Sequence, residues 1–370
     1  METLTMNAMD QEPTAQKIRA IADCEHNNTV AAAIIKLVIA SAAYGSSLAL
    51  ILAMPGFLLK LPFIILNGVL IFTMLTVAHD ACHGSLTRHP LLNKILARIA
   101  FLPPLTPYST WELIHNRLHH TFNNLRGHDY GWMPLSFEEY QKLGPVKRFL
   151  QRSAKTVSGL WIGILVEYWL KHIIFPRKKD MDRIKNKQLL AFDIAITIAY
   201  FFLAVAMIRI GDNHLTALLG RSPTSFIPLM LEALVLPYII SHYTLSFVSF
   251  QQHTHPKTMW YSSKEEWNNY RAWVRSTVHI RLPKWAEIIL NNIMIHNAHH
   301  IDMKVSACDL PKSQKQLEEK FDEMIVEDFS FKAFLNKLKV CRLYDYKNHQ
   351  WLDFDGTPTS PSMCREEVYR

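Results

Sequence analysis

The chain has 370 residues, of which 49% are hydrophobic and 19% are charged, and its formal net charge at pH 7 is +8. So much apolar content with so little charge is typical of a protein that lies largely in a lipid bilayer, and it argues against two or three soluble domains. The cysteines number five, an odd count. They include no CxxC pair, which excludes a disulfide framework and a cysteine-based zinc site.

The chain begins with a polar segment, residues 1–29, in which we expect one short surface helix at 16–24. Two apolar runs follow at 37–59 and 61–78, separated by Lys60. Each run has about the 20 residues that a helix needs to cross a hydrocarbon core of about 30 Å. The two runs therefore predict a pair of membrane-spanning helices joined by a tight turn.

A second apolar pair lies at 189–208 and 226–250. The pattern predicts an all-α integral membrane protein with four transmembrane helices in two hairpins. Asp193 and Glu232 are the acidic residues of the second pair, and both lie near expected span ends. We therefore expect them to make ordinary contacts between helices. The whole membrane domain is expected to cover residues 30–340.

Two long segments, 79–188 and 251–340, contain most of the 40 lysine and arginine residues. Because positively charged loops remain in the cytoplasm, we expect both segments and both termini on that side, where the segments form a helical cap. Within the cap, residues 157–175 are expected to lie as a helix in the membrane plane and residues 312–327 to form another helix. Residues 341–370 are expected to be a loosely ordered tail. The location of the basic residues on one side of the membrane, and their attraction to anionic lipid, account for the positive net charge. Nucleic-acid binding is therefore not expected.

Eight of the 18 histidines fall into three clusters, each just beyond the end of an apolar stretch. Residues three to five apart on a helix return to nearly the same face, so each cluster can direct two or three imidazoles at one point. With four spans, all three clusters reach the same side of the membrane. The sequence therefore predicts one histidine-rich metal site in the cap. The clusters are His79 and His83; His115, His119 and His120; and His296, His299 and His300.

Imidazole binds several transition metals, so the ligand type alone does not identify the metal. The number of histidines is more informative about the kind of site. A catalytic zinc usually takes three protein ligands and a structural zinc takes four. Eight clustered histidines exceed both needs and favour two metal ions. Polar residues beside the clusters are expected to orient the ring nitrogens or to add a ligand. They are Asp80, Asn116, Asn297 and Asp302.

The histidine clusters and two segments near them resemble motifs of a known protein family. The segment RGHDYGWMPLS at 126–136 resembles the one after the second histidine box of bacterial acyl-lipid desaturases, and WVRSTVH at 273–279 resembles the stretch before the third box. The similarity covers about residues 35–325. Four motifs resemble, in order and spacing, the histidine boxes of membrane fatty acid desaturases: HDACHGS at 79–85, HNRLHHTFNN at 115–124, FQQHTHP at 250–256 and HNAHH at 296–300.

The resemblance implies an oxidoreductase whose di-iron centre uses O₂ to form a cis double bond in a fatty acyl chain. It favours a chain carried on a membrane lipid over one carried on coenzyme A. It makes the eight box histidines iron ligands and adds a ninth histidine between the fourth span and the third box. We choose His253 as this ligand and keep His255 and His279 as alternatives, either as the ligand or as residues that orient one.

The two electrons for each turnover are expected to come from outside the chain. The sequence has no HPGG haem motif and no ferredoxin-like cysteine run, so no fused haem or flavin is expected. The resemblance implies an external donor, a ferredoxin or a small b-type cytochrome with its reductase, which would dock on the basic cytoplasmic surface. The protein is expected in a bacterial inner membrane, with its active site facing the cytoplasm.

Two other functions remain open at this point. A related di-iron membrane oxygenase, such as a carotenoid ketolase or hydroxylase or an alkane hydroxylase, would use the same histidine pattern. The segment at 126–136 favours the desaturase. A membrane metal transporter or sensor would need ionisable residues along its spans, and the four runs contain very few.

Overall fold

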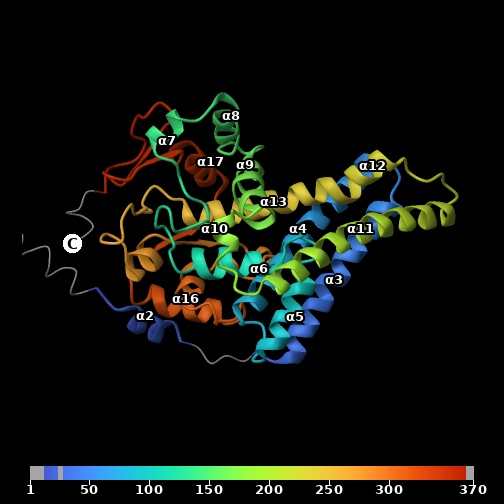
Figure 1. Ribbon diagram of the computed structural model, residues 1–370, viewed down its shortest axis with the longest axis horizontal. Helices are drawn as coiled ribbons and strands as arrows, with labels where there is room; N and C mark the ends of the chain where they lie inside the picture. Colours follow the sequence, from blue (N-terminus) through green and yellow to red (C-terminus); the bar gives the residue numbers. More distant parts are fainter. Residues whose placement is uncertain (1–11, 24–27, 364–370) are drawn as a thin grey trace, which may run out of the picture.

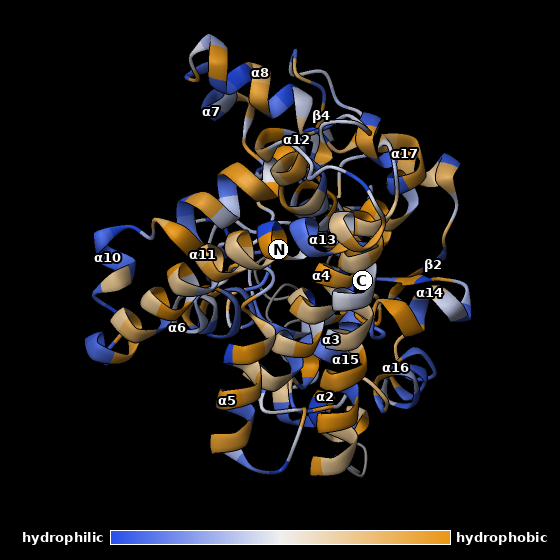
Figure 2. Ribbon diagram, turned by 90° about the vertical axis from the view of Figure 1, so that its right-hand side faces the viewer, coloured by the Kyte–Doolittle hydropathy of each residue, from blue (hydrophilic) through white to orange (hydrophobic). Residues whose placement is uncertain are grey.

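The computed structural model describes residues 12–23 and 28–363. In this part of the chain, four helices are long and apolar enough to cross a membrane. They extend side by side from one end of the molecule, opposite the cap (Figure 1), and are coloured largely as hydrophobic in Figure 2. This confirms the expected class, a mostly helical membrane protein with four spans. The spans are α3 (Val30–Ala53), α4 (Phe57–His83), α11 (Lys187–Leu218) and a continuous helix made of α12 (Phe226–Met230), η3 (Leu231–Val235) and α13 (Leu236–His253).

The first turn lies earlier than the sequence predicts. Helix α3 ends at Ala53, and Gly56 has a φ of 70°, a conformation that favours glycine. Pro55 and Gly56 therefore end the first span, and Lys60 lies inside α4 rather than between the two spans. Helix α4 continues past its apolar part to His83. The first histidine cluster is thus an extension of a membrane-spanning helix.

Helix α4 is the central span and packs against both α3 and α13. Its contact with α13 is very close at Gly68, where an added Cβ would lie 2.6 Å from the Cβ of Ile240. Small residues allow such close packing of helices in a bilayer. This packing brings the C-terminal ends of α4 and α13, which carry His83 and His253, toward each other.

The acidic residues of the second hairpin make the expected contacts between helices. Glu232 pairs with Lys60 of α4 at 2.6 Å. Asp193 of α11 is fully buried, pairs with Arg98 at 2.6 Å and accepts a hydrogen bond from the backbone N–H of Ser109 at 3.1 Å. Asp193 thus ties the third span to the start of the cap.

Replacing Arg98 by methionine is expected to destabilise the protein by about 3 kcal/mol, because it leaves the Asp193 carboxylate buried without its cation. Thermal unfolding in detergent measures the effect as a lower Tm. The double variant Arg98→Met/Asp193→Leu should recover part of the loss, since it removes both charges. An unchanged Tm for Arg98→Met would show that this ion pair does not hold α11 to the cap.

In the described residues, the cap consists of short helices and two sheets of two strands each; the short helices gather at one end of the molecule in Figure 1. The region 157–175 forms α9 and η2, which are not among the four helices long enough to span. Helix α2 agrees with the surface helix expected near residue 16. The cap elements are α2 (Ala15–Ala22), α5 (Pro90–Ala100), α6 (Tyr108–Trp111), η1 (Glu112–His119), α7 (Phe137–Gln141), α8 (Pro145–Ser153), α9 (Leu160–Ile162), η2 (Gly163–Ile174), α10 (Lys178–Met181), η4 (Arg271–Arg275), β1 (Val278–Arg281), α14 (Lys284–Ile289), α15 (His296–Ile301), α16 (Leu310–Glu318), β2 (Ile325–Asp328), α17 (Phe331–Val340), β3 (Leu343–Asp345) and β4 (Gln350–Leu352).

Two predictions for the end of the cap are wrong. The helix expected at 312–327 ends at Glu318, and β2 begins at Ile325 and pairs in parallel with β1. The segment expected to be loose from 341 onward instead forms the β3–β4 hairpin, in which Tyr344 and Trp351 are fully buried against Trp260. Aromatic residues in the tail supply this small core, which its Ser, Thr and Pro content does not suggest. Residues 364–370 lie outside the described part.

Candidate metal centre

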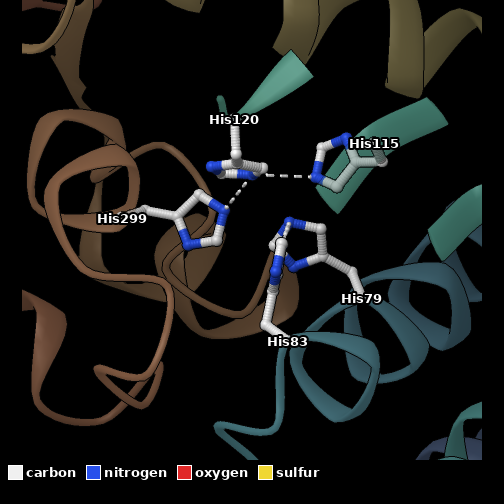
Figure 3. A group of neighbouring side chains, drawn as sticks. All are labelled: His79, His83, His115, His120 and His299. Atoms are coloured by element: carbon white, nitrogen blue, oxygen red, sulfur yellow. Dashed lines mark hydrogen bonds between the residues drawn. The ribbon is translucent and has the colours of Figure 1, made fainter. Parts of the chain in front are cut away.

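The nine histidines expected as ligands gather at the C-terminal ends of α4 and α13 in two adjoining groups. Within each group, the candidate ligand atoms all lie within 4.8 Å of one another. The first histidine group contains His79, His83, His115, His120 and His299 (Figure 3), and the second contains His119, His253, His296 and His300. The rings of His120 and His300 stack at 4.3 Å between centroids, so the groups share a border.

Helix geometry explains how most of the histidines are sorted. His79 and His83 are four residues apart on α4 and face the same point. His296 and His300 have the same spacing on α15 and both belong to the second group, whereas His299 points into the first. A six-residue helix thus supplies candidate ligand atoms to both groups.

The histidines of the second cluster are divided between the two groups because they lie on an unusual helix. Element η1 is a π-helix, and its hydrogen bond from His120 N to His115 O (3.1 Å) spans five residues instead of four. Residues i and i+5 then share a face, so His115 aligns with His120 and not with His119. His119 is left to point into the second group. Wider turns of this kind occur often at functional sites.

Ring nitrogens meet head to head in both groups. In the first, the Nε2 atom of His120 lies 3.1 Å from that of His115 and 3.2 Å from that of His299, contacts drawn as dashed lines in Figure 3. In the second, the Nε2 atom of His296 lies 2.9 Å from that of His253 and 3.0 Å from that of His300.

These contacts fit metal binding better than hydrogen bonding alone. One ring nitrogen offers either a single proton or a single lone pair, so the Nε2 atom of His120 cannot form good hydrogen bonds with two other Nε2 atoms at once. The same holds for His296. A cation at each convergence point would accept all of the lone pairs, and the donor set therefore fits two metal ions.

Burial keeps the imidazoles in the form that metals need. It lowers their pKa well below the usual range, and the neighbouring histidines lower it further. A neutral ring has a free lone pair, so these rings are prepared to bind a cation without first losing a proton. This applies to His115, His120, His296, His299 and His300.

One histidine in each group is held by a carboxylate. His79 Nδ1 donates to Asp80 Oδ1 at 3.2 Å, and His119 Nδ1 donates to Asp129 Oδ1 at 2.8 Å. Such contacts fix the ring and leave Nε2 free for a metal. Asp80 is among the residues predicted to orient a ring, whereas Asp129 is not, although it lies in the segment at 126–136 that follows the second cluster.

Comparison with known proteins agrees with this geometry. A model of the fatty acid desaturase family matches residues 55–332, most of the chain. The chain belongs to the fatty acid desaturase family. Its relatives include the sn-1 oleoyl-lipid 12-desaturase of Picosynechococcus sp., 25% identical over 310 residues that cover 82% of each chain. The chloroplastic omega-6 fatty acid desaturase of Glycine max is also 25% identical over 310 residues, which cover 84% of this chain and 68% of that one.

The other candidate residues of the desaturase have different partners. His255 Nε2 donates to Glu327 and His279 Nδ1 to Glu318, each at 2.7 Å, and neither histidine belongs to the two groups. The remaining three polar candidates bond to the backbone: Asn116 to Cys82 O, Asn297 to Trp273 O and Thr277 O, and Asp302 to Lys304 N.

Two cavities reach the histidines of the desaturase from different sides. The inner cavity, of about 50 Å³, lies beside His115, His119, His253 and His296 and is otherwise lined mainly by apolar and aromatic residues such as Trp111. The polar cavity, of about 530 Å³, touches His83, His120 and His300 and is bordered by Arg19 and Lys304. The centre thus has an apolar and a polar approach. The inner cavity's other lining residues are Gly131, Trp132, Ile164, Tyr168, Leu245, Ser249 and Gln252.

Proposed function

We propose that this desaturase is an O₂-dependent di-iron enzyme that forms a cis double bond in a fatty acyl chain carried on a membrane lipid. The observation that carries the proposal is the pair of adjoining, buried, all-histidine groups. Removing hydrogen from an unactivated alkyl chain with O₂ requires a redox-active centre, and a site made of imidazoles alone suits a redox-active metal. Zinc has no redox chemistry, whereas iron does and accepts imidazole ligands.

The metal pair would supply the oxidising power by which O₂ accepts two hydrogens from adjacent methylenes, together with two electrons and two protons, to give two waters. The protein's part is to hold the nine imidazoles in fixed positions around the metal ions. Asp80 and Asp129 orient one ring in each group. The buried setting excludes water from the reacting carbons and so limits side reactions.

The inner cavity is the proposed place of the reacting part of the acyl chain. Trp111, Ile164, Tyr168 and Leu245 give it apolar walls beside the histidines. A chain held between them would present one pair of methylenes to the metal centre, and this positioning would decide where the double bond forms.

The names of the relatives support the choice of substrate. One is described as acting on an oleoyl-lipid at position 12 and the other as an omega-6 desaturase. We propose for this chain a lipid-linked oleoyl substrate, with acyl-CoA as the second possibility.

The polar cavity supports an external electron donor that approaches from the cytoplasm. Its border carries Arg19 and Lys304 against one carboxylate, Asp302, and this net positive charge would attract an acidic ferredoxin or a small b-type cytochrome, supplied by its reductase. The positive charge of the two cap segments supports a cytoplasmic active site, and we place the protein in a bacterial inner membrane with both termini in the cytoplasm.

Expression in a bacterium without polyunsaturated lipids tests the proposal. Mass spectrometry of the lipids is expected to find a second double bond in chains that had one, and the purified protein is expected to contain about two iron ions per chain. An oxygenated lipid without a new double bond would instead favour a hydroxylase or ketolase. Zinc in place of iron would contradict the proposed cofactor.

A further inference from the structure

A second, larger cavity adjoins the inner cavity. This outer cavity has a volume of about 210 Å³ and shares Gly131, Trp132, Ile164 and Tyr168 with the inner cavity. Its wall also contains Lys155 and several other polar or charged residues: Asp129, Gln151, Glu167, Lys171, His172, Arg177 and Arg342. The two cavities thus share part of a wall, and the inner one borders His119, His253 and His296 of the second histidine group.

The outer cavity contains hydrogen-bond donors without acceptors. Among the described residues, Lys155 Nζ, Trp132 Nε1 and Arg342 Nε are buried and have no hydrogen-bond partner. Leaving a buried donor unsatisfied costs about 1–3 kcal/mol, and more for a charged group. Three such donors around one cavity indicate a ligand that offers acceptor oxygens.

Lys155 is the most informative of the three. It is 7% exposed, and its Nζ lies 4.3 Å from the centre of the Trp132 ring and 5.4 Å from that of Phe250. Burial lowers the pKa of Lys155 to about 7. Aromatic faces stabilise a cation only in part, so a bound anion would restore the charged form.

The other charged groups of the wall already have partners. Lys171 pairs with Glu167 at 2.8 Å, and Arg177 pairs with Asp180 at 2.9 Å. Arg342 pairs through Nη1 with Asp353 at 2.5 Å, although its Nε has no acceptor, so among the described residues the unpaired cation of the wall is Lys155. Asp129 is held by His119. Within the described part of the chain, the charge left for a ligand in this cavity is therefore positive.

We propose that the outer cavity binds a phosphate group of the acyl carrier, with Lys155, Trp132 and Arg342 as its donors. This inference rests on the proposed function, because the acyl chain attached to that phosphate would continue into the inner cavity. Two carriers have this chemistry, a phosphoglycerolipid and coenzyme A. A galactolipid lacks the phosphate and would leave the buried lysine without its counter-charge.

The test compares wild type with Lys155→Met in steady-state desaturation of three probes: dioleoyl phosphatidylglycerol in vesicles, dioleoyl monogalactosylglycerol in vesicles, and oleoyl-CoA. Methionine keeps the length and the contact with Trp132 but removes the charge. KM for the phosphate-bearing substrate is expected to rise about tenfold, the effect of one lost charge-assisted hydrogen bond, with kcat within about twofold. KM for the galactolipid should not change, and Lys155→Arg should restore most of the loss. The phosphate probe whose KM rises identifies the carrier.

Lys147→Met is the matched control, because Lys147 lies on α8 near Lys155 but is exposed. It should behave as wild type. If KM is the same in wild type and Lys155→Met for both phosphate probes, Lys155 is only a structural residue and the inference is wrong.

A binding measurement separates this inference from the proposed function. Short-chain dioctanoyl phosphatidylglycerol is expected to raise the Tm of the wild-type protein but not that of Lys155→Met, because it binds the folded state. This result does not depend on catalysis. A wild-type protein that is stabilised by the lipid but desaturates none of the three probes would contradict the proposed function and leave the phosphate site supported, whereas equal Tm shifts in both proteins would overturn the site.

Discussion

Replacing His253 by alanine is expected to remove one metal ion and nearly all activity. The second histidine group has four members, and His253 Nε2 lies 2.9 Å from His296 Nε2. Three ligands would remain, and the variant would leave an opening beside the inner cavity. Loss of a residue that merely orients a ligand lowers metal affinity or activity about 10–100-fold, so loss of a ligand should lower activity by more than about 100-fold. Iron analysis should find about one ion per chain instead of about two.

His255→Ala is the matched control for this variant. His255 lies only two residues further along the chain, but it pairs with Glu327 outside the two groups. Its loss should leave iron content and kcat near wild type and should lower the Tm modestly, because Glu327 retains Lys337 at 2.6 Å. If His255→Ala loses iron and His253→Ala keeps it, the proposed ligand set is wrong at this position.

The spans and the common location of the histidines could be predicted from the sequence because they depend on simple regularities. Long apolar runs define spans, and an even number of spans returns the chain to the same side of the membrane. The exact span ends could not be derived from hydropathy. The turn at Pro55 and Gly56 and the extension of α4 to His83 depend on local backbone conformation rather than on apolar content.

The division of the histidines into two groups was beyond sequence analysis. The spacing of His115, His119 and His120 suggests that the first two share a face, as in an α-helix. The π-helix instead pairs His115 with His120. The spacing of the histidines does not reveal that this helix has wider turns. The division into one group of five histidines and one group of four therefore requires the three-dimensional structure.

The residues that support the histidines were also only partly predictable. Proximity in sequence correctly suggested that Asp80 contacts a ring, because it directly follows His79. The same argument suggested Asn116 and Asn297, which instead bond to backbone carbonyls. Asp129 is ten residues from its partner and reaches it through a loop fold. Such a contact through a loop follows neither the helix period nor the strand period, so the sequence pattern does not predict it.

Asp129→Asn is expected to weaken iron binding in the second group about 10–100-fold, the usual effect of losing a carboxylate that orients a ligating histidine. Oδ1 of Asp129 accepts from His119 Nδ1 at 2.8 Å and from Gly131 N at 2.7 Å, and Oδ2 accepts from Asn124 N at 2.9 Å. An amide has one acceptor oxygen and two donor hydrogens, so it cannot accept all three hydrogen bonds. If its oxygen keeps His119 and Gly131, its NH₂ group faces the N–H of Asn124, and the uncharged oxygen is a weaker acceptor than the carboxylate. The ring of His119 is therefore held less firmly. Iron titration of the apoprotein, followed by activity at each iron level, measures the change.

The control for this variant is Asp302→Asn, which lies beside the third cluster but bonds only to the backbone N–H of Lys304 in the described structure. Its iron affinity should stay within about twofold of wild type. The two metal positions should respond differently in Asp129→Asn, because His79 in the first group keeps its own carboxylate, Asp80. The expected titration therefore has one tight and one weakened step. Equal weakening of both steps would mean that Asp129 supports the whole cap rather than one histidine, and two unchanged steps would mean that the hydrogen bond to His119 does not tune the centre.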